Sequence, residues 1–564
     1  MQLPVSGHFA KPLLHQRHRF DRLSKYHYPT ATRWGIFCAR IFSADIFAAV
    51  RCLNMSLDRQ FLALQQKFGA VAAISIADIN AATDFAIDAN SARRGDLTLE
   101  LLEPLAKRTP YVAKIWQLLG LAWRDEQDMG KSVDAFEMAT KLAPQDVRIQ
   151  LGKAQVAFET GQTSAHLFKA IRGVAPNDGE LALSAAAALV HEGKAEAGEN
   201  LIVEMLTRDL AWLRGLDALA TMRWTAGDQN TFDRAFADSV KAHPQDLLLR
   251  LAWFRAVSQV EAWEKATVII SGCRQAIGDR IEIDAIEAHV ATEMGDDDRA
   301  ETLFSKATAL NDPGTKISLV RHCLRTGRID QAEAICQTLI GTPAAPSTWP
   351  YLSTIWRLKS DPRAAWLDGE TPYIGQYDLP ISTHELDELA ACLRRLHLTT
   401  THPPEQSLRG GTQTQGHLFL RLEPELQAIK AMIADAVREY VAELPVYAEG
   451  HPLLGTPRQV LHFAGAWSVR LSAQGFHVVH THPLGWISSA FYVALPERMG
   501  DGQAGWLQLG APPPDLRLDL AAYRMIEPKP GRLALFPSTM WHGTVPFNDG
   551  ERLTIAFDMR VPSR

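Results

Sequence analysis

The hydrophobic positions between residues 56 and 345 recur at helical spacing, in short amphipathic runs rich in alanine and leucine. Glycines separate these runs and mark the turns between them. The pattern therefore predicts an all-α region that is built from helical hairpins.

The hairpins follow a repeat. Their aromatic and small residues resemble the tetratricopeptide consensus, which has a period of about 34 residues. The residues that carry this resemblance are Trp116, Leu119, Gly120, Trp123, Phe136, Ala139 and Pro144. Because each unit must stack on the next to bury its apolar face, we expect a tetratricopeptide-like solenoid over residues 56–345. Its concave surface is the expected binding site for a protein or peptide partner.

The helical pattern breaks at residues 341–347, and residues 361–380 contain several prolines and glycines without sustained helical spacing. Ser382, followed three residues later by Glu385, forms a capping box that starts a new helix. We therefore assign residues 346–405 to a linker with a supporting helix.

Another helix begins at Pro424, and after Leu444 the hydrophobic period changes to two. Short β-type runs, separated by glycine, proline and aspartate clusters, are typical of an all-β barrel or sandwich. In the last run, large apolar residues alternate with Arg552, Thr554, Ala556 and Asp558. Residues 406–564 are therefore predicted to form a β domain, and the chain is expected to be a multidomain α + β protein.

Residues 1–55 do not share the regular pattern. Residues 34–50 are apolar, but they include Arg40 and Asp45 and are too short for a membrane span. Two interpretations stay open: a leader segment, or a start placed too early, with Met55 opening the protein. No membrane association is expected.

The composition narrows the functional classes. The chain has 564 residues, more than one core usually supports, and 46% of them are hydrophobic. A net charge of −6 without a basic run argues against nucleic-acid binding. The six cysteines include no C-x-x-C pair, so neither a zinc knuckle nor a disulfide framework is indicated, and a reducing, cytoplasmic location is the simplest interpretation.

Three histidines form a candidate metal site. His480 and His482 are two residues apart, so in an extended segment they share a face and can direct both rings to one point. His542, which follows the predicted strand 532–536 and a tight turn, is the natural third ligand. Three protein ligands on one face of a metal ion leave its opposite coordination positions open for a bidentate cosubstrate and dioxygen, which suits Fe(II). Arg552 and Thr554, on one face of the last strand, can together bind a carboxylate.

These segments carry a family resemblance. HTHP, GWISSAFYVALP, PKPGRLALFPSTMWHGTVPF and ERLTIAFD resemble the core of 2-oxoglutarate-Fe(II) oxygenases and, more distantly, of aspartyl/asparaginyl β-hydroxylases. The resemblance covers about the last 120 residues. It implies a double-stranded β-helix, a jelly-roll or cupin-like fold, with supporting helices. It also implies Fe(II), 2-oxoglutarate as cosubstrate and dioxygen, with His480 and His542 as ligands, Arg552 as the cosubstrate anchor and Thr554 beside it.

His482 departs from the family pattern, H-x-D/E. It either supplies a third nitrogen ligand, which we favour, or points away so that water fills the place. A halogenase is disfavoured, because histidine is bulky at the position that would hold chloride.

Four further features have a functional and a structural interpretation. Tyr492 is a candidate cosubstrate hydrogen-bond donor or a packed aromatic residue, and Arg470 faces the cavity as a cosubstrate contact or forms a surface ion pair. His477 is structural or binds a ligand by a hydrogen bond. The polar double-glycine segment 406–414 could line the substrate entrance.

The leading hypothesis is an Fe(II)- and 2-oxoglutarate-dependent dioxygenase that hydroxylates a protein or peptide recruited by the repeats. The alternatives are a non-catalytic scaffold with a degenerate oxygenase barrel, and a metal-dependent barrel enzyme that uses dioxygen without 2-oxoglutarate.

Overall fold

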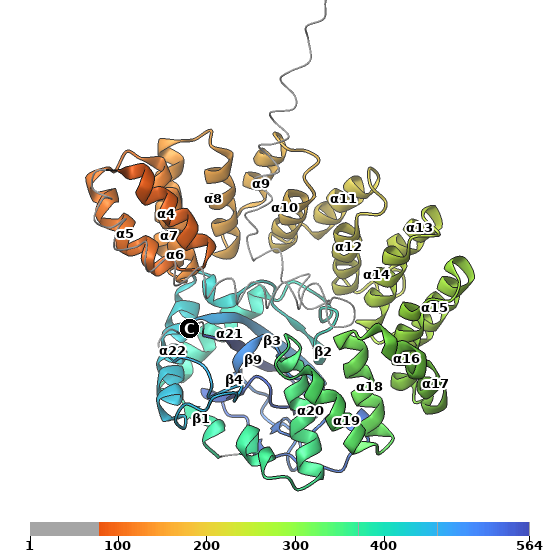
Figure 1. Cartoon of the computed structure of the whole chain (residues 1–564). Helices are drawn as coiled ribbons and strands as arrows, with labels where there is room; N and C mark the ends of the chain where they lie inside the picture. Colours follow the sequence, from red (N-terminus) through yellow and green to blue (C-terminus); the bar gives the residue numbers. More distant parts are fainter. Residues whose placement is uncertain (1–77, 370, 459–460, 563–564) are drawn as a thin grey trace, which may run out of the picture.

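The computed structural model describes residues 78–369, 371–458 and 461–562, so the predictions for residues 1–55 lie outside the described residues. Helices of the N-terminal part form an arc around β-sheets of the C-terminal part (Figure 1). We call residues 79–358 the solenoid and the described residues from 371 onward the β region.

The helices of the solenoid follow one another as packed neighbours, which confirms the predicted helical repeats. Their bounds are α4 Ile79–Ser91, α5 Gly95–Arg108, α6 Ala113–Asp125, α7 Met129–Leu142, α8 Val147–Glu159, α9 Ala165–Arg172, α10 Gly179–His191, α11 Ala195–Leu206, α12 Leu213–Thr225, α13 Arg234–Ala242, α14 Leu247–Ser258, α15 Trp263–Ile277, α16 Ile281–Met294, α17 Asp297–Ala307, α18 Pro313–Arg325, α19 Ile329–Leu339 and α20 Ala345–Leu358. Among the described residues, none of the helices is both long and apolar enough to cross a bilayer.

Aspartates begin the first helix of several repeats. Asp146, Asp178, Asp246 and Asp312 each accept a hydrogen bond from a backbone N–H in the first turn of the helix that follows. Such caps satisfy donors that the helix itself leaves unpaired.

Glycines let neighbouring helices approach around Phe136. A Cβ atom added to Gly120 would lie 2.7 Å from the Phe136 ring, and one added to Gly152 would overlap it from the other side. The small residues of the repeat pattern therefore have a packing role.

One residue with positive φ follows the first helix of each repeat. These residues are Arg93, Gln127, Gly161, Gly193, Gly227, Glu261, Gly295, Gly327 and, after α20, Ser360. They recur at intervals of 32 to 34 residues and therefore mark the repeat through the whole solenoid.

The solenoid continues beyond the predicted boundary. The linker was expected to begin at residue 346, but Ala345–Leu358 forms α20, which packs against α19. Pro346 lies in the first turn, where its missing N–H costs no helical hydrogen bond. The proline-rich sequence therefore starts a helix here.

Two antiparallel sheets form the β region. The large sheet has the order β1-β7-β4-β9-β3-β2, and the small sheet has the order β6-β5-β8. The bounds are β1 Gly375–Asp378, β2 Leu408–Gln413, β3 Phe463–His477, β4 Gly485–Ala494, β5 Leu507–Leu509, β6 Arg524–Ile526, β7 Arg532–Pro537, β8 His542–Thr544 and β9 Arg552–Arg560. The predicted change from helical to β periodicity is therefore confirmed.

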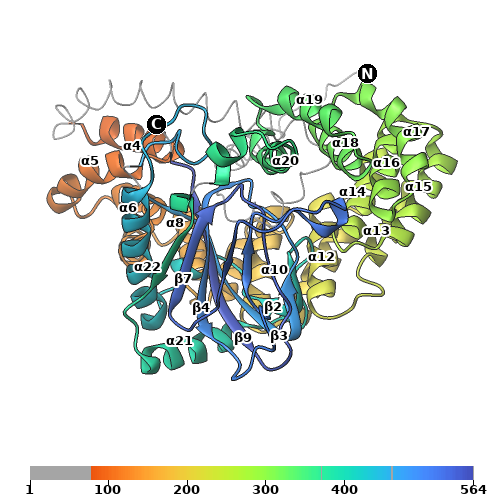
Figure 2. The same ribbon diagram turned by 90° about the horizontal axis from the view of Figure 1, so that it is seen from below.

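Two helices cover the outer face of the large sheet, α21 Thr383–Leu396 and α22 Pro424–Glu443 (Figure 2). The predicted capping box of Ser382 and Glu385 is present at the start of α21. Large apolar residues of β9, such as Ile555 and Phe557, belong to this outer core. The inner face turns toward the small sheet, where Phe536 packs with Leu509.

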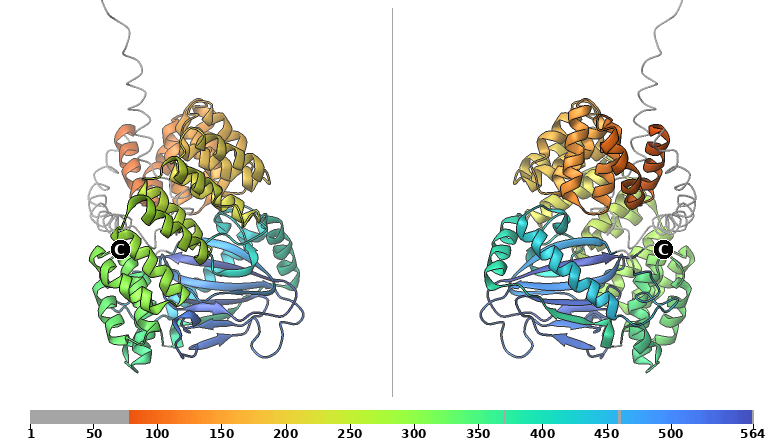
Figure 3. Two further views of the ribbon diagram at one scale, coloured as in Figure 1. Left: turned by 90° about the vertical axis from the view of Figure 1, so that its right-hand side faces the viewer. Right: turned by 90° about the vertical axis from the view of Figure 1, so that its left-hand side faces the viewer.

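The solenoid lies against the β region (Figure 3) and contacts it through turns between its helices and through residues of the helices themselves. Gln127 exchanges two hydrogen bonds with the main chain of Phe463, at 2.7 and 3.2 Å. Farther along the solenoid, Glu261 pairs with Arg409 at 2.6 Å. Further contacts join Trp224 to His402, Asp297 to Arg517, Arg321 to Asp515 and Arg357 to Gly510.

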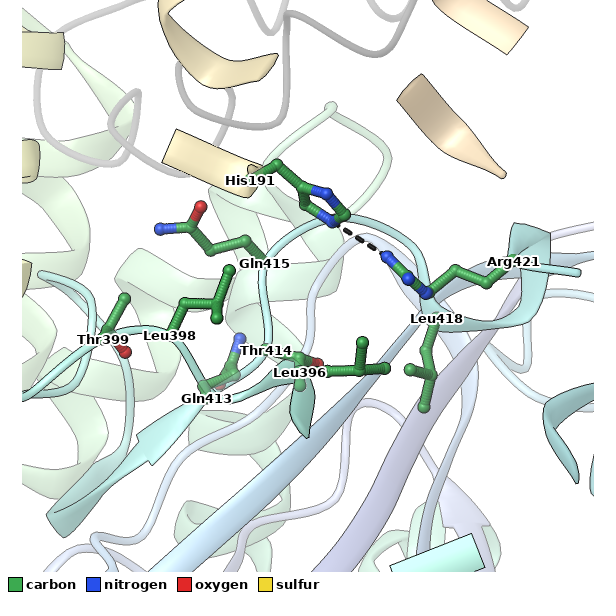
Figure 4. A pocket seen from close by; sticks show the side chains of 9 residues that line it. All are labelled: His191, Leu396, Leu398, Thr399, Gln413, Thr414, Gln415, Leu418 and Arg421. Atoms are coloured by element: carbon green, nitrogen blue, oxygen red, sulfur yellow. Dashed lines mark hydrogen bonds between the residues drawn. The ribbon is translucent and has the colours of Figure 1, made fainter. Parts of the chain in front are cut away.

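A small pocket lies at this junction, between β2 and the end of α10 (Figure 4). His191 and Arg421 form its upper rim and are hydrogen-bonded to each other at 2.9 Å. Arg421 also pairs with Glu423. The charged groups of the pocket therefore serve the contact between the solenoid and the β region.

Candidate metal centre

Three histidines from two separate segments meet between the sheets. The main chains of His480 and His542 form an isolated antiparallel bridge, with N···O distances of 2.9 and 3.0 Å. The ring centroids of these two residues are 4.1 Å apart, and that of His482 lies 5.0 Å from each. Each ring offers one nitrogen, and these nitrogens lie within 4.8 Å of one another. Such a group can hold one metal ion.

The protein fixes the tautomer of two of the rings. His480 Nδ1 lies 2.8 Å from the carbonyl oxygen of Val478, and His542 Nδ1 lies 3.0 Å from that of Met540. A carbonyl oxygen only accepts hydrogen bonds, so each Nδ1 carries the proton. Nε2 of each ring is left as the lone-pair donor that a metal requires.

A carboxylate holds the third ring. His482 Nδ1 lies 2.6 Å from Oδ1 of Asp558, and the Ser488 hydroxyl donates to the same oxygen at 2.7 Å. Ser488 Oγ also lies 2.9 Å from Ser538 Oγ. The hydrogen bond to Asp558 leaves Nε2 of His482 for the cluster, a geometry that supports the ligand role over the alternative in which the ring points away.

Burial lowers the pKa of His480 and of His542, which keeps these two rings neutral. It lowers the pKa of His480 well below its usual value, and neighbouring histidines add to this shift. It lowers the pKa of His542 to about 3. Neutral imidazole is the form that binds a metal, so both rings are ready to do so at pH 7.

An arginine is buried on the same inner face, and no acidic residue of the described part of the chain forms an ion pair with it. Arg552 is 2% exposed, and its Nη1 donates to the Gly505 carbonyl oxygen at 3.0 Å. Among the described residues, its Nε has no hydrogen-bond partner, and neither has the hydroxyl of Tyr492. The guanidinium carbon lies 5.2 Å from the centre of the Tyr492 ring. Burial lowers the pKa of Arg552 and raises the pKa of Tyr492.

These unpaired groups are suited to an anion. A buried cation and a buried hydroxyl both cost free energy unless a hydrogen-bonding partner satisfies them. Thr554, paired in register with Tyr492, lies on the same face of β9 as Arg552. The carboxylate of a bound ligand would complete this set, so the residues present fit a dicarboxylate cosubstrate.

The structure does not bring Arg470 to this site. Its side chain is 46% exposed and pairs with Glu551 at 2.5 Å. Arg470 is in register with Leu553, which packs in the outer core, so both side chains lie on the face opposite to Arg552. The expectation that Arg470 faces the cavity is therefore wrong.

The double-glycine segment forms an edge strand, β2, and not an open loop. Its pairing with β3 shifts register between Arg409 and Gly411. Gly410 has a φ of 71°, and a Cβ atom at Gly411 would overlap the carbonyl oxygen of Arg470. The glycines therefore serve a β-bulge and close strand packing.

Two residues that support the site were not singled out from the sequence. The first is Ser488, which donates a hydrogen bond to Asp558. The second is Trp541, next to His542. Its indole N–H lies 3.1 Å from the Pro350 carbonyl oxygen and 3.0 Å from Thr354 Oγ1. The position of a tryptophan beside a predicted ligand was the available signal. Its partner helix, α20, was predicted to be a linker.

Comparison with known proteins agrees with this geometry. Residues 465–558 match the family model described as "Putative 2OG-Fe(II) oxygenase". The β region therefore contains a 2OG-Fe(II) oxygenase domain. No curated protein matches the chain.

Solved structures show a low similarity that covers less than half of the chain. A prolyl-4-hydroxylase from Pseudomonas putida is 18% identical over 34% of this chain and 93% of its own, with a TM-score of 0.25. An oxidoreductase of the 2OG-Fe(II) oxygenase family from Burkholderia pseudomallei is 17% identical over 36% and 90%, with a TM-score of 0.23. A tetratricopeptide repeat protein from Parabacteroides merdae is 14% identical over 42% and 96%, with a TM-score of 0.28.

Proposed function

We propose that this protein is an Fe(II)- and 2-oxoglutarate-dependent dioxygenase that hydroxylates a protein or peptide, and that its two sheets form a double-stranded β-helix. The observation that carries the proposal is that two buried groups, Arg552 Nε and the Tyr492 hydroxyl, have no hydrogen-bond partner among the described residues. They lie on the sheet face that also bears Asp558, the partner of His482. A metal site without 2-oxoglutarate would leave the buried charge of Arg552 without an anionic partner among the described residues.

Each residue has a defined role. His480, His482 and His542 would hold Fe(II) through Nε2. Arg552, with Thr554 and Tyr492, would bind the far carboxylate of 2-oxoglutarate. Fe(II), 2-oxoglutarate and dioxygen together supply the oxidation that converts a C–H bond of the substrate to an alcohol. The protein fixes their positions and excludes water from the buried anchor.

The substrate class rests on the helical repeats. Tetratricopeptide-like repeats commonly bind peptides or proteins, and the acidic chain, of net charge −6, is not suited to nucleic acid. The proposal includes a cytoplasmic location, which only the cysteine pattern supports. The four described cysteines, Cys273, Cys323, Cys336 and Cys392, are free and buried.

The proposal predicts that purified protein binds one Fe(II) and one 2-oxoglutarate without oxygen, and forms succinate in air. Arg552→Ala should weaken 2-oxoglutarate binding about 100-fold, because it removes a charge-assisted, buried contact, and should leave metal binding in place. Calorimetry under nitrogen measures the binding of Fe(II) and of 2-oxoglutarate. Succinate detection measures turnover in air.

Arg394→Ala is the matched control, because Arg394 lies on α21 and pairs with Glu551 on the outer face. Its 2-oxoglutarate affinity should equal that of the wild type. Metal binding without any 2-oxoglutarate binding would support an oxygen-dependent enzyme of another type. Failure to bind either one would support the scaffold alternative.

A further inference from the structure

A fourth histidine lies beside the candidate metal centre. His477 ends β3, and its ring is nearly parallel to that of His480, with 6.1 Å between centroids and 22° between planes. It is not one of the three histidines whose nitrogens cluster. Burial lowers the pKa of His477 to about 3, and the charge of Arg552 is the next largest cause. His477 therefore lies beside the proposed ligand His480, at a place that the charge of Arg552 reaches.

One nitrogen of this ring is fixed and the other is free. The Ser407 hydroxyl lies 2.9 Å from Nδ1, and the backbone N–H of His477 donates to Thr544 Oγ1 at 2.8 Å. Among the described residues, Nε2 of His477 has no hydrogen-bond partner, and it is not a fully buried atom. When Ser407 donates to Nδ1, Nε2 carries the proton and can donate to a ligand.

The chain segment that leads into β2 and includes its first two residues, 399–409, positions Ser407; we call it the strap. The solenoid holds the strap at two successive repeats: Thr400 N donates to the Thr225 carbonyl oxygen, and Glu405 N donates to that of Gln259, both at 3.0 Å. Arg409, at the other end, pairs with Glu261. Val478 N donates to the Ser407 carbonyl oxygen at 2.8 Å, so the strap is joined directly to the segment that carries the histidines.

We propose that His477 is a further cosubstrate-binding residue, which donates a hydrogen bond from Nε2 to 2-oxoglutarate and is held in place by the strap through Ser407. This inference rests on the function proposed above. A dicarboxylate has several acceptor oxygens, and the Nε2 donor of His477 can satisfy one of them in addition to those that Arg552 would bind.

The test is calorimetric titration of the full-length, Mn(II)-loaded protein with 2-oxoglutarate, since Mn(II) binds such sites without turnover. His477→Ala should weaken 2-oxoglutarate binding about 10-fold, the value of one hydrogen bond to a charged group. Mn(II) affinity should stay within about twofold. The control is His397→Ala, which removes a half-buried histidine that Thr412 and Ser468 hold on the outer face of the sheet.

Two amide variants of His477 distinguish a hydrogen bond to 2-oxoglutarate from a purely structural role. Glutamine places its amide nitrogen near the position of Nε2, whereas asparagine places its amide near Nδ1. His477→Gln should therefore recover most of the 2-oxoglutarate affinity, and His477→Asn should behave like alanine. Recovery by asparagine and not by glutamine would show a structural role and overturn the proposal.

The remaining outcomes are also decisive. If His477→Ala weakens Mn(II) and 2-oxoglutarate binding equally, or weakens neither, His477 does not bind the cosubstrate, and the proposed function stands without it. If the wild type binds Mn(II) but no 2-oxoglutarate, the proposed function fails and this inference fails with it.

Discussion

His482 occupies the position at which the H-x-D/E pattern has a carboxylate, and Asp558 lies 2.6 Å behind it. The negative charge of a carboxylate is therefore present, but Asp558 would act on the proposed metal through the His482 ring and not by direct contact. A carboxylate that accepts from Nδ1 makes the imidazole a better ligand and fixes its orientation. We infer that the His482 and Asp558 pair replaces the acidic ligand.

This inference predicts that Asp558→Asn weakens Fe(II) or Mn(II) binding about 10- to 100-fold, the usual effect of removing a carboxylate behind a ligating histidine. Anaerobic metal titration measures it. Asp378→Asn is the control, because Asp378 forms surface ion pairs with Arg532 and Lys529. Unchanged metal affinity in Asp558→Asn would favour the alternative in which His482 does not ligate.

At the scale of elements, the residues with positive φ show how the solenoid is fitted to the β region. Most of these positions are glycine, which adopts positive φ without steric cost. Gln127 and Glu261 are exceptions, and both use their side chains to bind the β region. The backbone strain of a non-glycine residue, about 1 kcal/mol or more, is there offset by a contact that glycine could not make.

Replacing such residues with glycine should have opposite effects at two equivalent positions. Arg93→Gly should raise the melting temperature slightly, because it relieves backbone strain, and the exposed side chain of Arg93 makes no hydrogen bond to the described residues that would be lost. Gln127→Gly should lower the melting temperature, because it removes two hydrogen bonds to Phe463. Thermal unfolding of both variants gives the comparison, and equal shifts would contradict this interpretation.

The sequence predicts elements well where a local pattern determines them. The capping box of Ser382, the 34-residue period and the alternation in β9 are local, and the structure confirms them. Two features depend on distant contacts instead. Arg470 lies outward because of its register with Leu553, and strand register is not encoded within a single strand. Helix α20 is stabilised by packing against α19 and Trp541, although its prolines suggest a linker.

At the scale of the whole molecule, the last helix of the solenoid reaches the candidate metal centre. Trp541 is buried against α20, where its ring meets Tyr351 edge-on with 5.4 Å between centroids. Because His542 is the next residue, the packing of α20 helps to set the position of a proposed ligand. The solenoid is therefore part of the support of the site, in addition to any role in recruiting a substrate.

Trp541→Phe should lower both the melting temperature and the metal affinity, the latter about 3- to 10-fold, because it removes the indole hydrogen bonds to Pro350 and Thr354. Trp356→Phe should lower the melting temperature alone, since that indole donates to Glu333 within the solenoid. Thermal unfolding and Mn(II) titration of both variants test the coupling. An unchanged metal affinity in Trp541→Phe would show that α20 supports only the fold.

The spacing of the contacts between solenoid and β region has a consequence for how this protein can evolve. A repeat array that is free along its length can gain or lose a unit by duplication or deletion of one period. Here Gln127, Glu261 and Arg321 each meet a fixed point of the same chain. One inserted unit would move every later contact residue of the solenoid away from its partner in the β region. We therefore expect the number of repeats to stay constant in evolution while the surface residues between the contacts vary.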